Sequence, residues 1–167
     1  IQVFARDAAG NEAVAALDHR PFTKAFQRSR INVDDRFFQQ VVPQIAAANP
    51  AKGYSTAAAD LLDSFLAING GLRRENNAYL VELSKTSEPR MLWQGPFKAL
   101  TNASVEARFA DNRTYVYQGK EVDRQVHLGF DLAVTQRVPV TAAHTGKVVH
   151  AGDLGIYGNC VVVDHGL

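Results

Sequence analysis

Apolar and polar residues alternate through residues 127–134, which is the period of a β-strand with one face in a core. The polar face carries His127 and Asp131, an imidazole and a carboxylate, two of the common zinc ligand types. In a fully extended strand their Cα atoms would lie roughly 13 Å apart, too far for both side chains to reach one ion. The backbone must therefore bend between them, and Gly129 is the position where a bend or bulge costs least. The residues expected on the buried face are Leu128, Phe130, Leu132 and Val134.

A helical period of apolar residues precedes this region. It predicts three helices, over residues 34–48, 55–68 and 72–83. Asp34 suits the N-cap of the first helix, and Pro43 is expected to kink or split it. We expect the three helices to pack with one another, separately from the strands that follow them.

Strand patterns dominate the last third of the chain. They cover residues 104–109, 114–118, 128–134, 146–151 and 159–163. At the N-terminus, two alternating stretches flank a turn signal and resemble the last hairpin of a β-sandwich. We therefore expect an α+β chain in three parts. These are the end of a β-sandwich-like segment over 1–18, a mainly helical region over 19–103 and an antiparallel β domain over 104–167.

Composition removes several classes of function. The chain has 18 Lys and Arg against 17 Asp and Glu, with no basic run, so we expect no nucleic-acid partner. No stretch of 18 apolar residues is present, so we expect no transmembrane segment. Cys160 is the single cysteine, which excludes an intramolecular disulfide and a cysteine zinc cluster. Gly70-Gly71 is expected to interrupt the helices and lacks the setting of a phosphate loop, so no cofactor-binding motif emerges.

A longer motif series surrounds His127 and Asp131 and resembles one known family. In order it reads His127-Leu128-Gly129-Phe130-Asp131-Leu132-Ala133, Val138-Pro139-Val140, Thr145-Gly146-Lys147-Val148-Val149, Ala151-Gly152, Gly155-Ile156-Tyr157-Gly158-Asn159 and Val161-Val162-Val163-Asp164-His165-Gly166. This order and spacing are similar to those of the lysostaphin/LytM-type zinc metallopeptidases, which cleave peptide cross-links of bacterial peptidoglycan. The resemblance covers about 40 residues and becomes weaker toward Phe109.

The resemblance implies that His127 and Asp131 are Zn²⁺ ligands. It places the third ligand in a later His-x-His motif, and a further histidine in a Tyr-x-His segment, neither of which this chain contains. His165 does not fill the gap, because in the family this histidine marks the end of a strand. No catalytic residue is therefore assigned within the chain. The histidines expected to lie at the surface, or to have their hydrogen bonds satisfied, are His19, His144 and His150.

The family's chemistry implies a zinc metalloendopeptidase that hydrolyses peptidoglycan peptides in the periplasm or cell envelope. Its β domain would be incomplete at Leu167, because a zinc site with two ligands lacks the third that catalysis needs. We therefore expect the chain to be paired with a missing C-terminal part of the same polypeptide. Tyr157, Gly155 and Gly158 would line the substrate groove, and the helices would cover or address it.

Two other classes of function remain open. One is a non-catalytic LytM-type module that binds and activates a cell-wall amidase; such modules usually lack metal ligands, whereas this chain keeps His127 and Asp131. The other is a plain β module that binds peptidoglycan or carbohydrate. The polar face with its histidine and aspartate makes this second class the weaker alternative.

Overall fold

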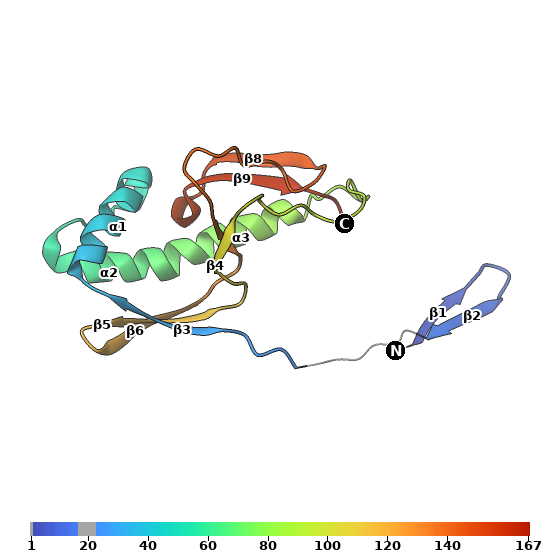
Figure 1. Cartoon of the computed structure of the whole chain (residues 1–167), viewed down its shortest axis with the longest axis horizontal. Coiled ribbons are helices and arrows are strands. Elements are labelled where there is room, and N and C mark those ends of the chain that lie inside the picture. Colours follow the sequence, from blue (N-terminus) through green and yellow to red (C-terminus); the bar gives the residue numbers. More distant parts are fainter. Residues whose placement is uncertain (1, 17–22) are drawn as a thin grey trace.

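A computed structural model of the chain describes residues 2–16 and 23–167 (Figure 1). It is an α+β structure, as the sequence predicts. The helices are α1 (Asp35–Ala48), α2 (Leu61–Leu66) and α3 (Arg73–Ser84), with short helical turns η1 (Pro50–Lys52), η2 (Ala58–Asp60) and η4 (Gly155–Tyr157) and a π-helical segment η3 (Ala67–Leu72). The strands are β1 (Gln2–Arg6), β2 (Glu12–Ala16), β3 (Arg28–Val33), β4 (Ser104–Ala107), β5 (Asn112–Tyr117), β6 (Lys120–Val126), β7 (Asp131–Ala133), β8 (Lys147–Asp153) and β9 (Asn159–Asp164).

Helix α1 begins where the sequence predicts. The Asp34 carboxylate accepts a hydrogen bond from the Phe37 amide at 2.7 Å, which satisfies one of the free N–H groups of the first turn. Pro43 does not split the helix, and α1 continues through it to Ala48. Burial of Phe38 and Val42, which are 1% and 0% exposed, offsets the hydrogen bond that proline removes.

The helical run from α2 to α3 is also continuous (Figure 1). The expected interruption at Gly70-Gly71 is therefore wrong. Both glycines lie instead inside the π-helical segment η3. A single π turn accommodates one extra residue without ending the helix, which is why glycines here change the helical period rather than stop the helix.

The main sheet has the order β3-β5-β6, with β3 parallel to β5 and β6 antiparallel to β5. Neither β3 nor β6 is predicted from the sequence. Strand β3 alternates arginine, serine and asparagine with only two apolar residues, and β6 carries four charged residues among its seven. Strands β5 and β6 are joined by a tight turn in which Gln118 and Gly119 have φ values of 48° and 78°, as type I′ hairpins require.

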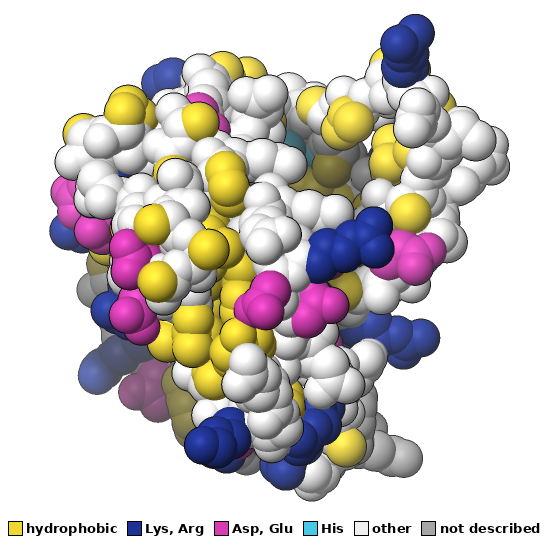
Figure 2. Space-filling view, turned by 90° about the vertical axis from the view of Figure 1, so that its left-hand side faces the viewer, with side chains coloured by type: hydrophobic (Ala, Val, Ile, Leu, Met, Phe, Trp, Pro, Cys, Tyr) yellow, Lys and Arg dark blue, Asp and Glu magenta, His cyan; other side chains and the backbone are white. Residues whose placement is uncertain are grey.

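The helices pack directly on this sheet. Phe65 of α2 lies 5.7 Å from the Tyr115 ring of β5, and Phe38 of α1 lies 5.2 Å from the Tyr117 ring. The expectation that the helices pack separately is therefore wrong, and the β3–β5 pairing crosses the boundary expected at 103–104. Figure 2 looks onto this end of the molecule and shows apolar side chains gathered at the centre, with charged side chains of both signs around them.

The remaining strands form pairs. Strands β1 and β2 make the expected N-terminal hairpin, all of whose strand residues are exposed. Strand β4 pairs with β7, and β8 pairs with β9. His19 lies outside the described residues. Among the helices that the structure describes, none is long and apolar enough to span a membrane.

The end of β9 is tied to the segment after α3. The Asp164 carboxylate accepts hydrogen bonds from the Ser87 hydroxyl and from the backbone N–H groups of Glu88 and Gly166. The Ser87 hydroxyl lowers the pKa of Asp164 most, followed by these two N–H groups. A depressed carboxyl pKa stabilises the fold above the pKa of the unfolded chain, and this contribution is lost as pH falls through the folded value.

We expect Ser87→Ala to raise the pKa of Asp164 toward its ordinary value. The stabilisation that this carboxylate provides should then be lost at a higher pH than in the wild type. An NMR titration of the Asp164 side chain measures the pKa, and acid unfolding followed by circular dichroism measures the stability. An Asp164 titration curve that is unchanged in the variant would contradict the assignment.

Candidate metal centre

The backbone bends between the two residues predicted to bind metal. Strand β6 ends at Val126, β7 begins at Asp131, and the intervening residues are irregular with a bend at Gly129. The expected bend is confirmed. It brings His127 Nε2 to 3.4 Å from Asp131 Oδ1, about the separation of two ligand atoms that each lie near 2 Å from a tetrahedral zinc.

Two backbone hydrogen bonds fix the position of His127. Its N–H donates to the Asp111 carbonyl at 2.9 Å, and its carbonyl accepts from the Ala110 N–H at 2.7 Å. Residues 110 and 111 directly precede β5, so the segment that leads into the main sheet holds the backbone of the histidine. The His127 side chain is only 15% exposed, whereas that of Asp131 is 57% exposed.

The atoms of the pair fit a metal ion. His127 Nε2 is buried and has no hydrogen-bond partner among the described residues, although it faces a carboxylate oxygen. Buried polar nitrogens are normally satisfied, and a neutral imidazole nitrogen is a common zinc donor. A zinc ion between Nε2 and Oδ1 would satisfy both atoms, so the donor set is compatible with Zn²⁺.

Arg113 holds the other side of the Asp131 carboxylate. Its Nη2 lies 3.5 Å from Asp131 Oδ2, and its Nε lies 3.4 Å from Asp111 Oδ2. The guanidinium therefore lies between a ligand candidate and a carboxylate whose side chain is only 4% exposed. This contact orients Asp131 so that Oδ1 faces His127. Arg113 could not be found from the sequence, because it lies on a different strand and belongs to no motif.

We expect Arg113→Gln to lower the free energy of unfolding by about 2–3 kcal/mol, because it leaves the buried Asp111 charge without its partner. Urea unfolding followed by circular dichroism measures the change. The double variant Asp111→Asn/Arg113→Gln should recover part of the loss, since it removes the stranded charge as well. Additive losses in the double variant would contradict the coupling.

Three of the four residues predicted to form the buried face of this segment are exposed, and the fourth, Val134, is half-buried. Leu128, Phe130 and Leu132 are 56%, 61% and 38% exposed, so that expectation is wrong. Strand β7 pairs only with β4, in a sheet of two strands, and two strands cannot cover a face of their own. The side chain of His127, on the face read as polar, is by contrast only 15% exposed.

A cavity of about 490 Å³ opens beside His127 and Asp131, the two predicted metal ligands, which are called the metal pair below. One wall is the loop that carries His127 and Asp131, and the opposite wall is helix α3. Tyr157, expected in the groove wall from the sequence, lines the cavity. The α3 residues that line it are Arg73, Asn77, Leu80 and Val81.

Helix α3 is joined to the turn η4, which carries Tyr157. The side-chain oxygen Oδ1 of Asn76 accepts a hydrogen bond from the Ile156 N–H at 3.0 Å, and the Tyr157 hydroxyl donates to Asn77 Oδ1 at 2.6 Å. Gly155 has φ +53°, and a Cβ there would lie 2.5 Å from the Asn76 side chain. This glycine therefore serves the close approach of α3 and does not line the cavity described above.

Residues 125–167 match the family model described as peptidase family M23. Residues 125–167, called the M23 segment below, are therefore similar to this family over about a quarter of the chain. The match begins two residues before His127 and includes Asp131, η4 and strands β7, β8 and β9. It confirms the resemblance to lysostaphin/LytM-type peptidases at the level of the family, over part of the domain. A search of curated proteins finds no match to the chain.

The M23 segment supplies two candidate ligands. In the part of the chain that the structure describes, no group of three or more His, Cys, Asp or Glu side chains is arranged to hold a metal. The role of His127 and Asp131 as ligands stays a prediction. The structure adds to the family match the observation that the two side chains lie close together, with Nε2 and Oδ1 3.4 Å apart.

The other histidines of the M23 segment have different partners. His165 Nδ1 lies 2.8 Å from the Thr145 carbonyl at the end of β9, in agreement with a role at a strand end. His144 Nε2 lies 2.6 Å from the Gln94 carbonyl, and its Nδ1 accepts from the Thr145 N–H. His150 Nδ1 lies 3.1 Å from the Tyr79 hydroxyl of α3.

Proposed function

We propose that the chain carries part of a zinc-dependent endopeptidase that hydrolyses peptide cross-links of bacterial peptidoglycan in the periplasm or cell envelope. The observation that carries the proposal is the pairing of His127 and Asp131 within a segment of peptidase family M23. The unpartnered His127 Nε2, 3.4 Å from the carboxylate, supports zinc as the cofactor.

Each residue of the site has a definable task. His127 offers a buried nitrogen lone pair that two backbone hydrogen bonds hold in place, and Asp131 contributes a negative charge oriented by Arg113. Zinc held by these side chains would polarise the scissile carbonyl. It would also lower the pKa of water, so that hydroxide is available to attack this carbonyl near neutral pH. The third ligand, and the groups that move protons, would come from residues outside the described ranges.

The cavity walls would hold an extended peptide beside the metal pair. Leu80 and Val81 of α3 face the exposed loop residues Leu128 and Phe130 across the cavity. These apolar side chains would exclude water from the scissile bond. The polar groups of Asn77 and Tyr157 at the same wall would bind peptide N–H and C=O groups.

The test uses the complete gene product and purified peptidoglycan. We expect about one zinc per protein by elemental analysis, release of cleaved cross-link peptides by chromatography and mass spectrometry, loss of release after chelation, and recovery with added zinc. Zinc-independent release would contradict the proposal. Stimulation of a cell-wall amidase without any release of peptides would favour the non-catalytic alternative, which the family match does not favour.

A further inference from the structure

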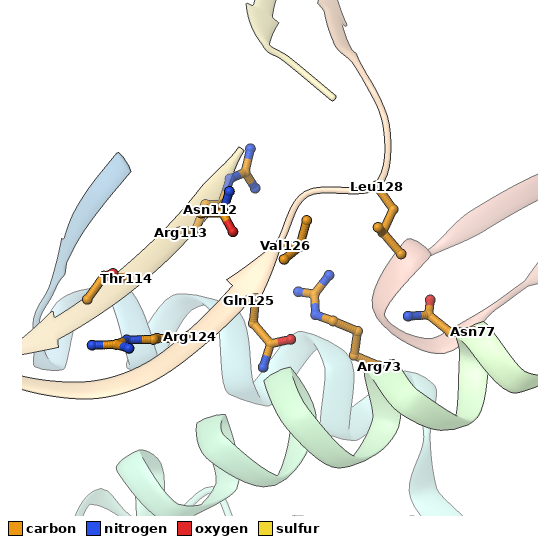
Figure 3. A pocket seen from close by; sticks show the side chains of 9 residues that line it. All are labelled: Arg73, Asn77, Asn112, Arg113, Thr114, Arg124, Gln125, Val126 and Leu128. Atoms are coloured by element: carbon orange, nitrogen blue, oxygen red, sulfur yellow. The ribbon is translucent and has the colours of Figure 1, made fainter. Parts of the chain in front are cut away.

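A second cavity, of about 340 Å³, lies between α3 and the β5–β6 hairpin (Figure 3). Its lining contains three arginines and no acidic residue. The lining residues are Arg73, Asn77, Asn112, Arg113, Thr114, Arg124, Gln125, Val126 and Leu128. Such a lining provides many hydrogen-bond donors, which is the chemistry that recognises an anion.

The three arginines differ in whether their charge is already paired. Arg113 contacts Asp111 and Asp131, and Arg124 contacts Glu121 at 2.6 Å. Arg73 lies within 4 Å of no carboxylate among the described residues. Its charge is therefore available to a ligand.

Arg73 is nevertheless held in one orientation. It is half-buried, and its Nε donates to the Asn69 carbonyl at 3.0 Å while Nη2 donates to Asn69 Oδ1 at 2.7 Å. The Asn69 side chain is fixed in turn by donating to Asp123 Oδ2 at 2.7 Å. One edge of the guanidinium is thus used for positioning, and Nη1 remains as a donor. Figure 3 shows the guanidinium extending from α3 toward Gln125 and Val126.

Asn77 provides a second donor one helical turn further along α3. Residues four apart on a helix share a face, and Figure 3 shows the Asn77 and Arg73 side chains rising together from α3. The Tyr157 hydroxyl donates to Asn77 Oδ1, and among the described residues the Asn77 amide N–H groups have no hydrogen-bond partner, so they can donate to a ligand. Arg73 and Asn77 therefore both offer N–H donors to the same cavity, and carboxylate oxygens accept such donors.

The cavity is contiguous with the one that contains the metal pair. Arg73, Asn77 and Leu128 line both cavities. A peptide lying beside His127 and Asp131 would therefore extend into reach of the two donors on α3. An anion bound there would belong to the same molecule whose amide bond lies at the metal pair.

We propose that Arg73 and Asn77 form a subsite that binds a carboxylate of the peptide substrate. The inference rests on the proposed function for the identity of the ligand as a peptide. The carboxylate is either the C-terminal group of the peptide or an acidic side chain within it. Helix α3, which lies outside the M23 segment, thereby contributes to substrate selection.

The experiment measures binding of three peptidoglycan-derived peptides to the complete gene product in the presence of a chelator, which prevents hydrolysis. One peptide carries both carboxylates, one is amidated at its C-terminus and one is amidated at its acidic side chain. We expect one of the two amidated peptides to bind about ten- to a hundredfold more weakly than the parent peptide, because it loses a hydrogen bond to a charged group. The amide that weakens binding identifies the source of the carboxylate.

Variants assign the effect to α3. Arg73→Gln should lower the affinity for the parent peptide by the same factor of about ten- to a hundredfold, and it should bind all three peptides with equal affinity. Arg73→Lys should retain part of the preference for the parent over the amidated peptide. Arg74→Gln, an equal loss of charge on the exposed side of α3, should bind as the wild type does. Thermal melts establish that each variant is folded.

Equal binding of the three peptides by the wild type would overturn the subsite, and so would a preference that survives Arg73→Gln. A carboxylate preference that depends on Arg73 in a protein that never cleaves peptidoglycan would uphold the subsite and reject only the peptidase function. The two proposals can therefore fail separately.

Discussion

Replacing His127 with alanine is expected to abolish zinc binding and peptide hydrolysis together. Changes in residues that merely support a metal ligand already cost about 10–100-fold in affinity, so removal of a ligand should exceed about a hundredfold. The fold should survive, because the backbone hydrogen bonds of His127 with Ala110 and Asp111 do not involve its side chain. Zinc titration with a competing chelating dye, together with a thermal melt, measures both effects.

His144→Ala is the matched control for this variant. It also removes one imidazole, but that ring bonds to the Gln94 carbonyl and the Thr145 N–H and not to the metal pair. Zinc affinity should therefore remain as in the wild type. If His127→Ala binds zinc with unchanged affinity, His127 is not a ligand and its contact with Asp131 is only a hydrogen-bonding or ionic one.

Phe38→Ala is expected to lower the free energy of unfolding by about 3–5 kcal/mol, the usual cost of removing a fully buried ring. Phe38 is 1% exposed and packs against the rings of Phe37, Phe65 and Tyr117. Its loss would open a cavity between α1, α2 and the main sheet. Urea unfolding monitored by circular dichroism measures the change.

Phe130→Ala makes the same chemical change at an exposed position. Because Phe130 is 61% exposed, most of its ring is already in water, and the expected loss is below about 1 kcal/mol. A loss as large as that of Phe38→Ala would mean that Phe130 is covered in solution by a segment beyond the described residues.

The sequence was sufficient to predict those features that depend only on residues a few positions apart in the chain. Asp34 caps α1 as predicted, because an N-cap bond spans three residues. The bend at Gly129 follows from the distance that His127 and Asp131 must cover. Both inferences use only geometry within a few residues.

Features that depend on distant segments escaped the sequence analysis. Strand β3 is recognisable only through its parallel pairing with β5, about 84 residues later in the chain. Arg113 contacts Asp131 from β5, and Asn77 lines the neighbouring cavity from α3, so no spacing in the sequence connects them with His127. The burial of the strand face was misjudged for a similar reason, since alternation identifies a face but not what covers it.

The π-helical segment η3 sets the direction in which α3 presents its side chains. Each residue of an α-helix advances the chain by about 100°, and a π turn holds one residue more than an α turn. Deleting one glycine from Gly70-Gly71 would therefore rotate Arg73 and Asn77 by about a quarter turn relative to α2, while the helix kept nearly its full length. In evolutionary terms, a single codon inserted or removed here would redirect the α3 wall of the cavity, at the expense of the packing of Leu72, which follows the glycines and lies in the core with residues of α1 and α2.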